Sequence, residues 1–157
     1  MKQLSAVLFV VFSGFILMSC STSVTTKQHT TIKEFGELPF GRLNLRASEF
    51  ENGRLSVKAT FGGVCTLGGD PNWIIFPLYD ETTSVPGPCT IMSPILGAVS
   101  RQRSELIETL KPNDVVMVIG ILTQNHTMMG QNNQYSLEVE SIQKIGQNKP
   151  ASSPFLK

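Results

Sequence analysis

A run of alternating residues follows the turn dipeptide Asn52-Gly53 and constrains the fold more than any other feature of the chain. Because successive side chains of a strand point to opposite faces of its sheet, this alternation predicts a strand with one buried and one solvated face. The apolar members of the run are Leu55, Val57, Ala59 and Phe61, and the polar members are Arg54, Ser56, Lys58 and Thr60.

Further strands are predicted along the rest of the chain. Residues 73–79 form a β-branched and aromatic run, and a short strand is expected around residues 89–92. In residues 115–122 every position except Gly120 is apolar, which predicts a central strand covered on both faces. Residues 135–139 alternate again and predict a last strand with one wet face.

One helix is expected between these strands. Leu106 and Leu110 are four residues apart with Ile107 beside them, and Val99 and Arg103 extend the same stripe toward the amino terminus. Lys111-Pro112 ends the pattern, because proline cannot continue a helix.

The order strand, strand, strand, helix, strand, strand resembles the oligonucleotide/oligosaccharide-binding (OB) fold. The phrases that carry the resemblance are NGRLSVKATFGGV, IIFPLYDE, LKPNDVVMVIGIL and YSLEVESIQKI. The resemblance implies an all-β domain with one helix, a five-stranded OB-fold-like barrel over residues 34–146. Alternation in residues 40–50 predicts a possible extra strand before the barrel. A small β-sandwich is the competing architecture, and the single helix argues against it.

The amino terminus carries a second resemblance. An apolar stretch over residues 4–18 follows Lys2 and ends in Leu17-Met18-Ser19-Cys20, which resembles the lipobox of bacterial lipoproteins. This resemblance implies cleavage before Cys20, lipidation of its sulfur and anchoring in a membrane. The alternative is an ordinary secreted protein, cut elsewhere, in which Cys20 is a thiol.

The two resemblances together predict the organisation of the chain. Residues 1–19 are expected to form a signal peptide, residues 20–33 a lipidated cysteine and flexible tether, and residues 147–157 a disordered tail, with the barrel between them. Because Ser21 follows the cysteine rather than Asp, the analogy with enterobacterial lipoproteins places the protein on the outer membrane facing the periplasm.

Charge argues against one class of partner. The expected signal peptide contains one basic and no acidic residue, so the mature chain has 12 Lys and Arg against 12 Asp and Glu. Binding to a phosphate backbone usually requires a strongly basic domain. This balance of charge disfavours nucleic acid as a partner, and the membrane and another envelope protein are the expected ones.

Two cysteines remain after lipidation of Cys20. An even pair in a small exported domain predicts a disulfide between Cys65 and Cys89. A redox or metal pair is disfavoured, because the two residues lack close C-x-x-C spacing.

Sequence motifs for catalysis are missing. The chain has no G-x-S-x-G, H-E-x-x-H or Walker pattern, so we expect a non-enzymatic protein without a cofactor. His29 and His126 lie in a predicted linker and loop, where solvation is the simplest role. Copper binding by His126, Met128 and Met129 is possible in principle, but an exposed loop is the favoured explanation.

Binding is the better class of function. OB folds receive ligands across their second and third strands, where aromatic side chains stack on ligands and cations meet anionic groups. The alternative is that the aromatic residues fill the barrel. We expect an interaction module of the envelope, or alternatively a protein that binds an oligosaccharide or another small envelope molecule. The candidate contacts are Trp73, Phe76, Tyr79, Arg54 and Lys58.

Overall fold

A computed structural model describes residues 31–65, 70–85, 95–126 and 134–149. The chain divides into two units, residues 1–30 and residues 31–157, and every described residue belongs to the second. The fold below is the fold of that second unit.

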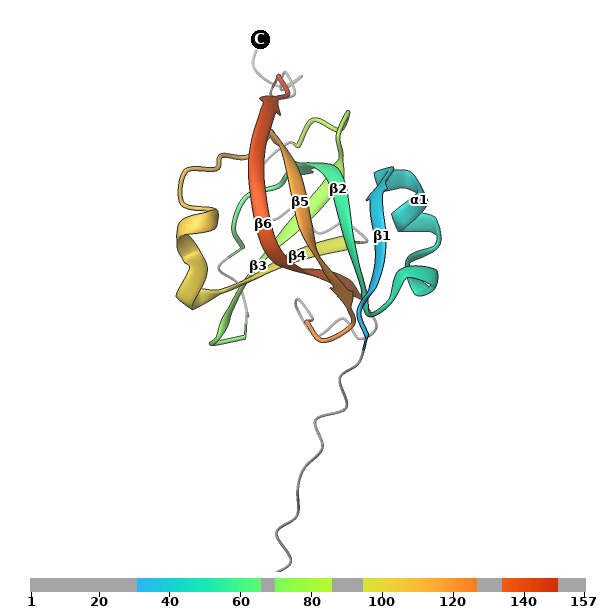
Figure 1. Cartoon of the computed structure of the whole chain (residues 1–157). Coiled ribbons are helices and arrows are strands. Elements are labelled where there is room, and N and C mark those ends of the chain that lie inside the picture. Colours follow the sequence, from blue (N-terminus) through green and yellow to red (C-terminus); the bar gives the residue numbers. More distant parts are fainter. Residues whose placement is uncertain (1–30, 66–69, 86–94, 127–133, 150–157) are drawn as a thin grey trace, which may run out of the picture. The chain divides into compact units, whose positions relative to one another are not determined.

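Five strands close into a barrel of mixed strand direction, and a sixth strand lies outside it (Figure 1). In the barrel, β2 pairs with β3 and β5, β3 with β4, and β5 with β6, all antiparallel, while β4 and β6 pair in parallel. This closure confirms the predicted all-β, OB-fold-like architecture. The strands are β1 (Lys33–Leu38), β2 (Gly53–Phe61), β3 (Trp73–Asp80), β4 (Ile95–Ser100), β5 (Asp114–Thr123) and β6 (Tyr135–Gln147).

The barrel core follows the alternation of β2. The four apolar side chains of this strand, from Leu55 to Phe61, are at most 2% exposed, and β5 supplies buried residues opposite them. The rings of Phe61 and Phe76 pack with their centroids 5.0 Å apart. The predicted half-buried strand is therefore confirmed, and its apolar face lines the interior.

The predicted strand at residues 40–50 is wrong, although an extra strand does exist as β1, which pairs in parallel with β2. Residues Phe40–Leu45 form α1, a short α-helix, and Ala47–Phe50 form a 3-10 helix. The physical reason is the spacing of the buried residues: Phe40, Leu43, Ala47 and Phe50 recur every three or four positions, which is helical spacing.

The predicted helix over residues 99–110 is also wrong. Val99 belongs to β4, where it pairs with Ile74 of β3, so its backbone is used by the sheet. Only a 3-10 segment, Arg101–Leu106, follows it, interrupted by a non-helical Arg103.

Nowhere in the described ranges is a helix long and apolar enough to span a membrane. The strand predicted at residues 89–92 lies outside the described residues.

The strands extend one residue beyond each end of the barrel domain predicted at residues 34–146. β1 begins at Lys33, and β6 ends at Gln147 rather than before it. Asn148 is also held in place, because its Nδ2 donates to Thr60 Oγ1 at 2.9 Å and to the carbonyl of Glu81 at 2.8 Å. Gln147 and Asn148, the first two residues of the predicted tail, therefore belong to the barrel domain.

Candidate functional site: a groove at Lys58 and a pocket at Trp73

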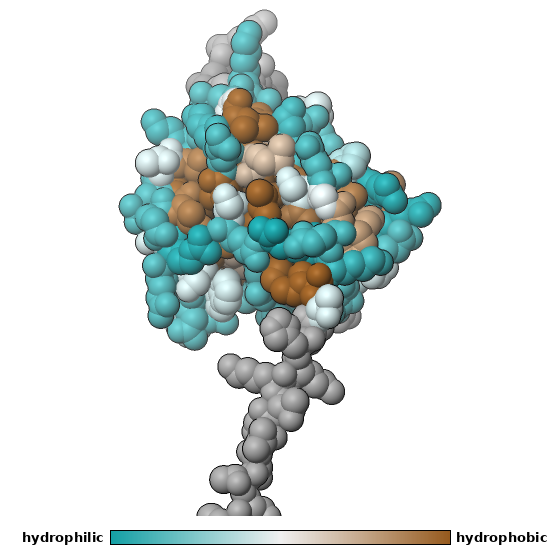
Figure 2. Space-filling view, viewed as in Figure 1, coloured by the Kyte–Doolittle hydropathy of each residue, from teal (hydrophilic) through white to brown (hydrophobic). Residues whose placement is uncertain are grey.

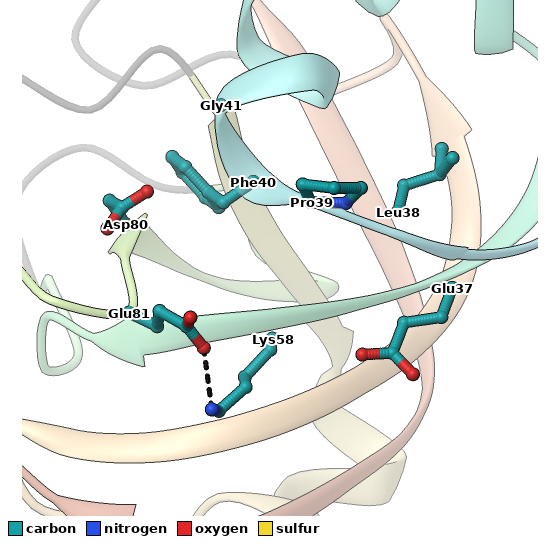
Figure 3. A pocket seen from close by; sticks show the side chains of 8 residues that line it. All are labelled: Glu37, Leu38, Pro39, Phe40, Gly41, Lys58, Asp80 and Glu81. Atoms are coloured by element: carbon teal, nitrogen blue, oxygen red, sulfur yellow. Dashed lines mark ion pairs between the residues drawn. The ribbon is translucent and has the colours of Figure 1, made fainter.

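A groove opens where β2 changes partners along one edge. β1 pairs with β2 as far as Leu38 and Val57, and β3 begins its pairing at Asp80 and Ala59, so Lys58 lies between the two neighbouring strands. The resulting pocket has a volume of about 420 Å³ (Figure 3). Its lining residues are Glu37, Leu38, Pro39, Phe40, Gly41, Lys58, Asp80 and Glu81.

Acidic groups dominate this groove. Lys58 Nζ lies 2.8 Å from a Glu81 carboxylate oxygen, and this contact, with Glu37 adding a smaller attraction, raises the pKa of Lys58. Asp80 accepts from the backbone N–H and the hydroxyl of Thr82, which lowers the pKa of its carboxyl. Figure 3 shows Asp80 and Glu81 on one side of Lys58 and Glu37 on the other. Glu81 and, more weakly, Glu37 therefore attract the Lys58 ammonium group, and Asp80 adds a third carboxylate to the lining of the groove.

A second hollow adjoins the first. It has a volume of about 560 Å³ and shares Lys58 and Glu81 with the groove. Val115 and Ile145 supply its apolar wall, and Ile145 is 45% exposed. The Lys58–Glu81 ion pair thus separates an acidic hollow from one with an exposed apolar side chain.

Arg54, the other predicted cation, has carboxylate partners of its own. Its Nε lies 2.6 Å from Glu140 and its guanidinium 3.4 Å from Glu34. These contacts, that with Glu140 first, raise the pKa of Arg54. Arg54 and Lys58 both lie on the wet side of β2 as predicted, and each is neutralised within the chain.

The three predicted aromatic residues have different surroundings. Phe76 is 0% exposed inside the barrel, so the core alternative applies to it. Tyr79 is partly buried, and this desolvation raises the pKa of its hydroxyl. Trp73 is half-buried on the outside of the barrel, because it lies on the opposite face of β3 from Phe76 and packs against a separate cluster of Cys65, Ile75 and Leu96.

His126 packs against Trp73 at the edge of this outer cluster, which corrects the prediction of a solvated loop histidine. Its side chain is 5% exposed, and its ring lies 4.3 Å from that of Trp73. His126 Nε2 is 3.1 Å from Glu138 Oε1, while Nδ1 is buried and has no hydrogen-bond partner among the described residues. No pattern in the sequence marks this histidine as buried, because the contact joins a loop to two strands.

Glu138 was not singled out in the sequence, since it is one of two acids on the wet face of the last strand. Its Oε1 accepts from Thr123 Oγ1 at 3.3 Å and from Asn125 Nδ2 at 3.1 Å, besides the contact with His126. These contacts fix the carboxylate beside Trp73. A pocket of about 260 Å³ lies there, lined by Trp73, Ser100, Arg103, Ile121, Glu138, Val139 and Glu140.

The remaining predicted residues can be placed only in part. Cys65 is disulfide-bonded, while Cys89 and Cys20 lie outside the described residues. Met128 and Met129 lie outside them as well, and so does His29. Within the described ranges no three His, Cys, Asp or Glu side chains gather closely enough to hold a metal ion.

The barrel topology defines this chain as an OB-fold-like all-β domain. No protein-family model matches it, and no curated protein does.

Among solved structures, the chain is similar to OBody AM2EP06 bound to hen egg-white lysozyme, with 13% identity and a TM-score of 0.45 over 64% of this chain and 86% of that one. It is also similar to a putative aspartyl-tRNA synthetase from Leishmania major Friedlin, with 9% identity and a TM-score of 0.47 over 82% of this chain and 24% of that one. The chain spans about a quarter of that synthetase.

Proposed function

We propose that this protein is a membrane-anchored periplasmic lipoprotein, held through Cys20 on the outer membrane, whose barrel is a non-enzymatic interaction module for another envelope protein. The observation that carries the proposal is the covered outer face of β3 and β4. OB folds receive extended ligands across the corresponding strands. Here Ile75 is 3% and Leu96 1% exposed, and Trp73 packs over them. Because these side chains are covered, docking at the edge of the barrel is favoured over ligand binding along the outer face of β3 and β4.

The surface suits an interface that combines polar and apolar contacts. Figure 2 shows hydrophobic side chains in small separate groups among hydrophilic ones on the face that it displays. Non-obligate interfaces have about the same apolar fraction as the rest of a protein surface, so a reversible partner needs no broad apolar patch.

The redox state of Cys65 supports export. Disulfides form and persist in oxidising compartments such as the periplasm and are rare in the cytosol. The disulfide-bonded Cys65 fits that location. We pair it with Cys89, as the count of cysteines remaining after lipidation of Cys20 predicts.

The membrane anchor is tested with globomycin, which inhibits signal peptidase II. Treated cells are expected to accumulate a larger precursor, and a Cys20→Ser variant is expected to leave the membrane fraction, because the acyl chains supply its attachment. A Cys65→Ser variant is the matched control, since it removes a different cysteine and keeps the lipid site. Unchanged size under globomycin would contradict the lipoprotein assignment.

A second candidate function is favoured by one observation, the pocket at Trp73. A half-buried indole beside the fixed carboxylate of Glu138 and the guanidinium of Arg103 suits stacking and hydrogen bonding to an oligosaccharide. Trp73 is the single tryptophan of the chain, so its fluorescence reports this pocket directly. Titration with a chitin-derived trisaccharide is expected to change the emission if this function holds, and an unchanged spectrum rejects it for that sugar.

A further inference from the structure

We infer that the groove at Lys58 docks an extended segment of a partner protein that carries a lysine or arginine next to an apolar residue. This inference rests on the proposed role as an interaction module and names its surface and the chemistry of its partner. It is argued from how the strands form the groove, from the charges that line it and from the apolar hollow beside it.

The groove is a gap that the strands of the barrel leave open. β1 runs parallel to β2 and β3 runs antiparallel to it, so both reach β2 with their carboxyl ends, on either side of Lys58. After Leu38 the chain turns into α1 instead of continuing toward Asp80. An extended segment of another chain can enter the space that remains between the two strand ends.

The charges around the gap favour a partner segment that carries a cationic side chain. Glu37, Asp80 and Glu81 line it, and Lys58 is the one basic residue among the lining residues that the structure describes. Lys58 is already held by Glu81 at 2.8 Å, which leaves Glu37 and Asp80 as the surplus acidic groups. Complementary charge speeds encounter and disfavours partners of like charge, so an anionic segment or an anionic membrane surface is repelled here.

The neighbouring hollow supplies the apolar contact. It begins at the Lys58–Glu81 pair, where the acidic groove ends, and its wall includes the exposed Ile145. Because the two hollows share this ion pair, a segment that crosses it presents one side chain to each of them. The partner therefore combines a cationic residue with an apolar neighbour.

The charge requirement is tested with fluorescent hexalysine, using the mature chain as purified from cells in a neutral detergent at low ionic strength. Binding is expected to shift the amide resonances of Glu37, Lys58 and Asp80 selectively. Glu37→Lys is expected to weaken binding at least about ten-fold, because it inverts one of the two surplus charges. Glu51→Lys is the matched control: it makes the same change at an exposed acid at the opposite end of β2 and is expected to weaken binding less than about two-fold.

The apolar requirement is tested with a peptide of alternating lysine and leucine. It is expected to bind about five-fold more tightly than hexalysine, and Ile145→Ser is expected to remove that advantage. Leu45→Ser is the matched control, because Leu45 is 84% exposed and lines neither hollow. Urea denaturation of each variant establishes that it folds like the wild type.

The inference would be overturned by equal binding of hexalysine to Glu37→Lys and Glu51→Lys, by equally tight binding of hexaglutamate, or by resonance shifts spread over the whole surface. A large gain in hexalysine affinity after removal of residues 150–157 would also overturn it, by assigning the groove to the chain's own tail. The proposed function fails separately. Photocrosslinkers placed in intact cells at Pro39 and at remote exposed sites would then capture no envelope protein, whereas capture only at the remote sites rejects the groove alone.

Discussion

Replacement of Gly120 by alanine is expected to lower the free energy of unfolding by about 3 kcal/mol, the upper part of the range for overpacking. A Cβ atom at this position would lie 2.3 Å from the carbonyl oxygen of Glu138 and 2.9 Å from its carbonyl carbon. Both are backbone atoms of the neighbouring strand, so a rotamer change cannot relieve the clash. β5 and β6 would have to separate along part of their pairing.

The bulge beside Gly120 explains why the backbones are so close. The pairing of β5 with β6 shifts its register between Ile119 and Gly120, where β6 carries an extra residue. Bulges increase local twist and bend the strand, which a small closed barrel requires. Glycine at position 120 lets the bend occur without a side chain between the strands.

Urea denaturation followed by Trp73 fluorescence measures this effect. Gly146→Ala is the matched control, because a Cβ there would meet Val115 at 3.6 Å, an ordinary contact in the same pair of strands. We expect the control to change stability by less than about 0.5 kcal/mol. Equal denaturation midpoints for the two variants would show that the close approach at Gly120 carries no energetic weight.

The strands that the sequence predicts best are those with a simple burial pattern. β2 alternates because one of its faces lines the barrel, and residues 115–122 of β5 are apolar except at Gly120 because neighbouring structure covers most of this strand. The helix prediction failed at Val99. The four-residue spacing between Val99 and Arg103 is the spacing of neighbours on one face of a helix, but Val99 lies in a strand. Pairing with Ile74 on another strand decides its conformation, and single-chain periodicity contains no information about that pairing.

The candidate sites illustrate the same limit. Lys58 was predicted as a surface cation from the alternation of β2, which depends only on neighbours in sequence. The groove around it exists because β1 ends at Leu38 while β3 ends at Asp80, and neither end was predictable from its own segment. Likewise, the contact of His126 with Trp73 joins residues more than fifty positions apart, so no local pattern reports it.

Truncation of Phe76 to alanine is expected to cost about 3 to 5 kcal/mol of unfolding free energy, the range for a large buried aromatic residue. The ring of Phe76 packs against that of Phe61, and a Cβ atom added to Gly97 would lie 2.2 Å from the Phe76 ring. The interior of the barrel therefore fits the phenyl ring of Phe76 closely, and Gly97 on β4 leaves room for that ring. Removal of the ring leaves a cavity that these rigid neighbours cannot fill.

Phe35→Ala is the matched control for this loss. Phe35 is also aromatic and stacks edge-on against Phe50 at 5.0 Å, but it lies on β1, outside the barrel, and is only partly buried. We expect it to cost about 1.5 kcal/mol, in proportion to the smaller apolar area that it removes from water. A smaller loss for Phe76→Ala than for Phe35→Ala, measured by urea denaturation, would contradict the core role and return Phe76 to the candidate ligand contacts. With the expected order, ligand binding on β3 is confined to residues of its outer face, of which Trp73 has a pocket beside it.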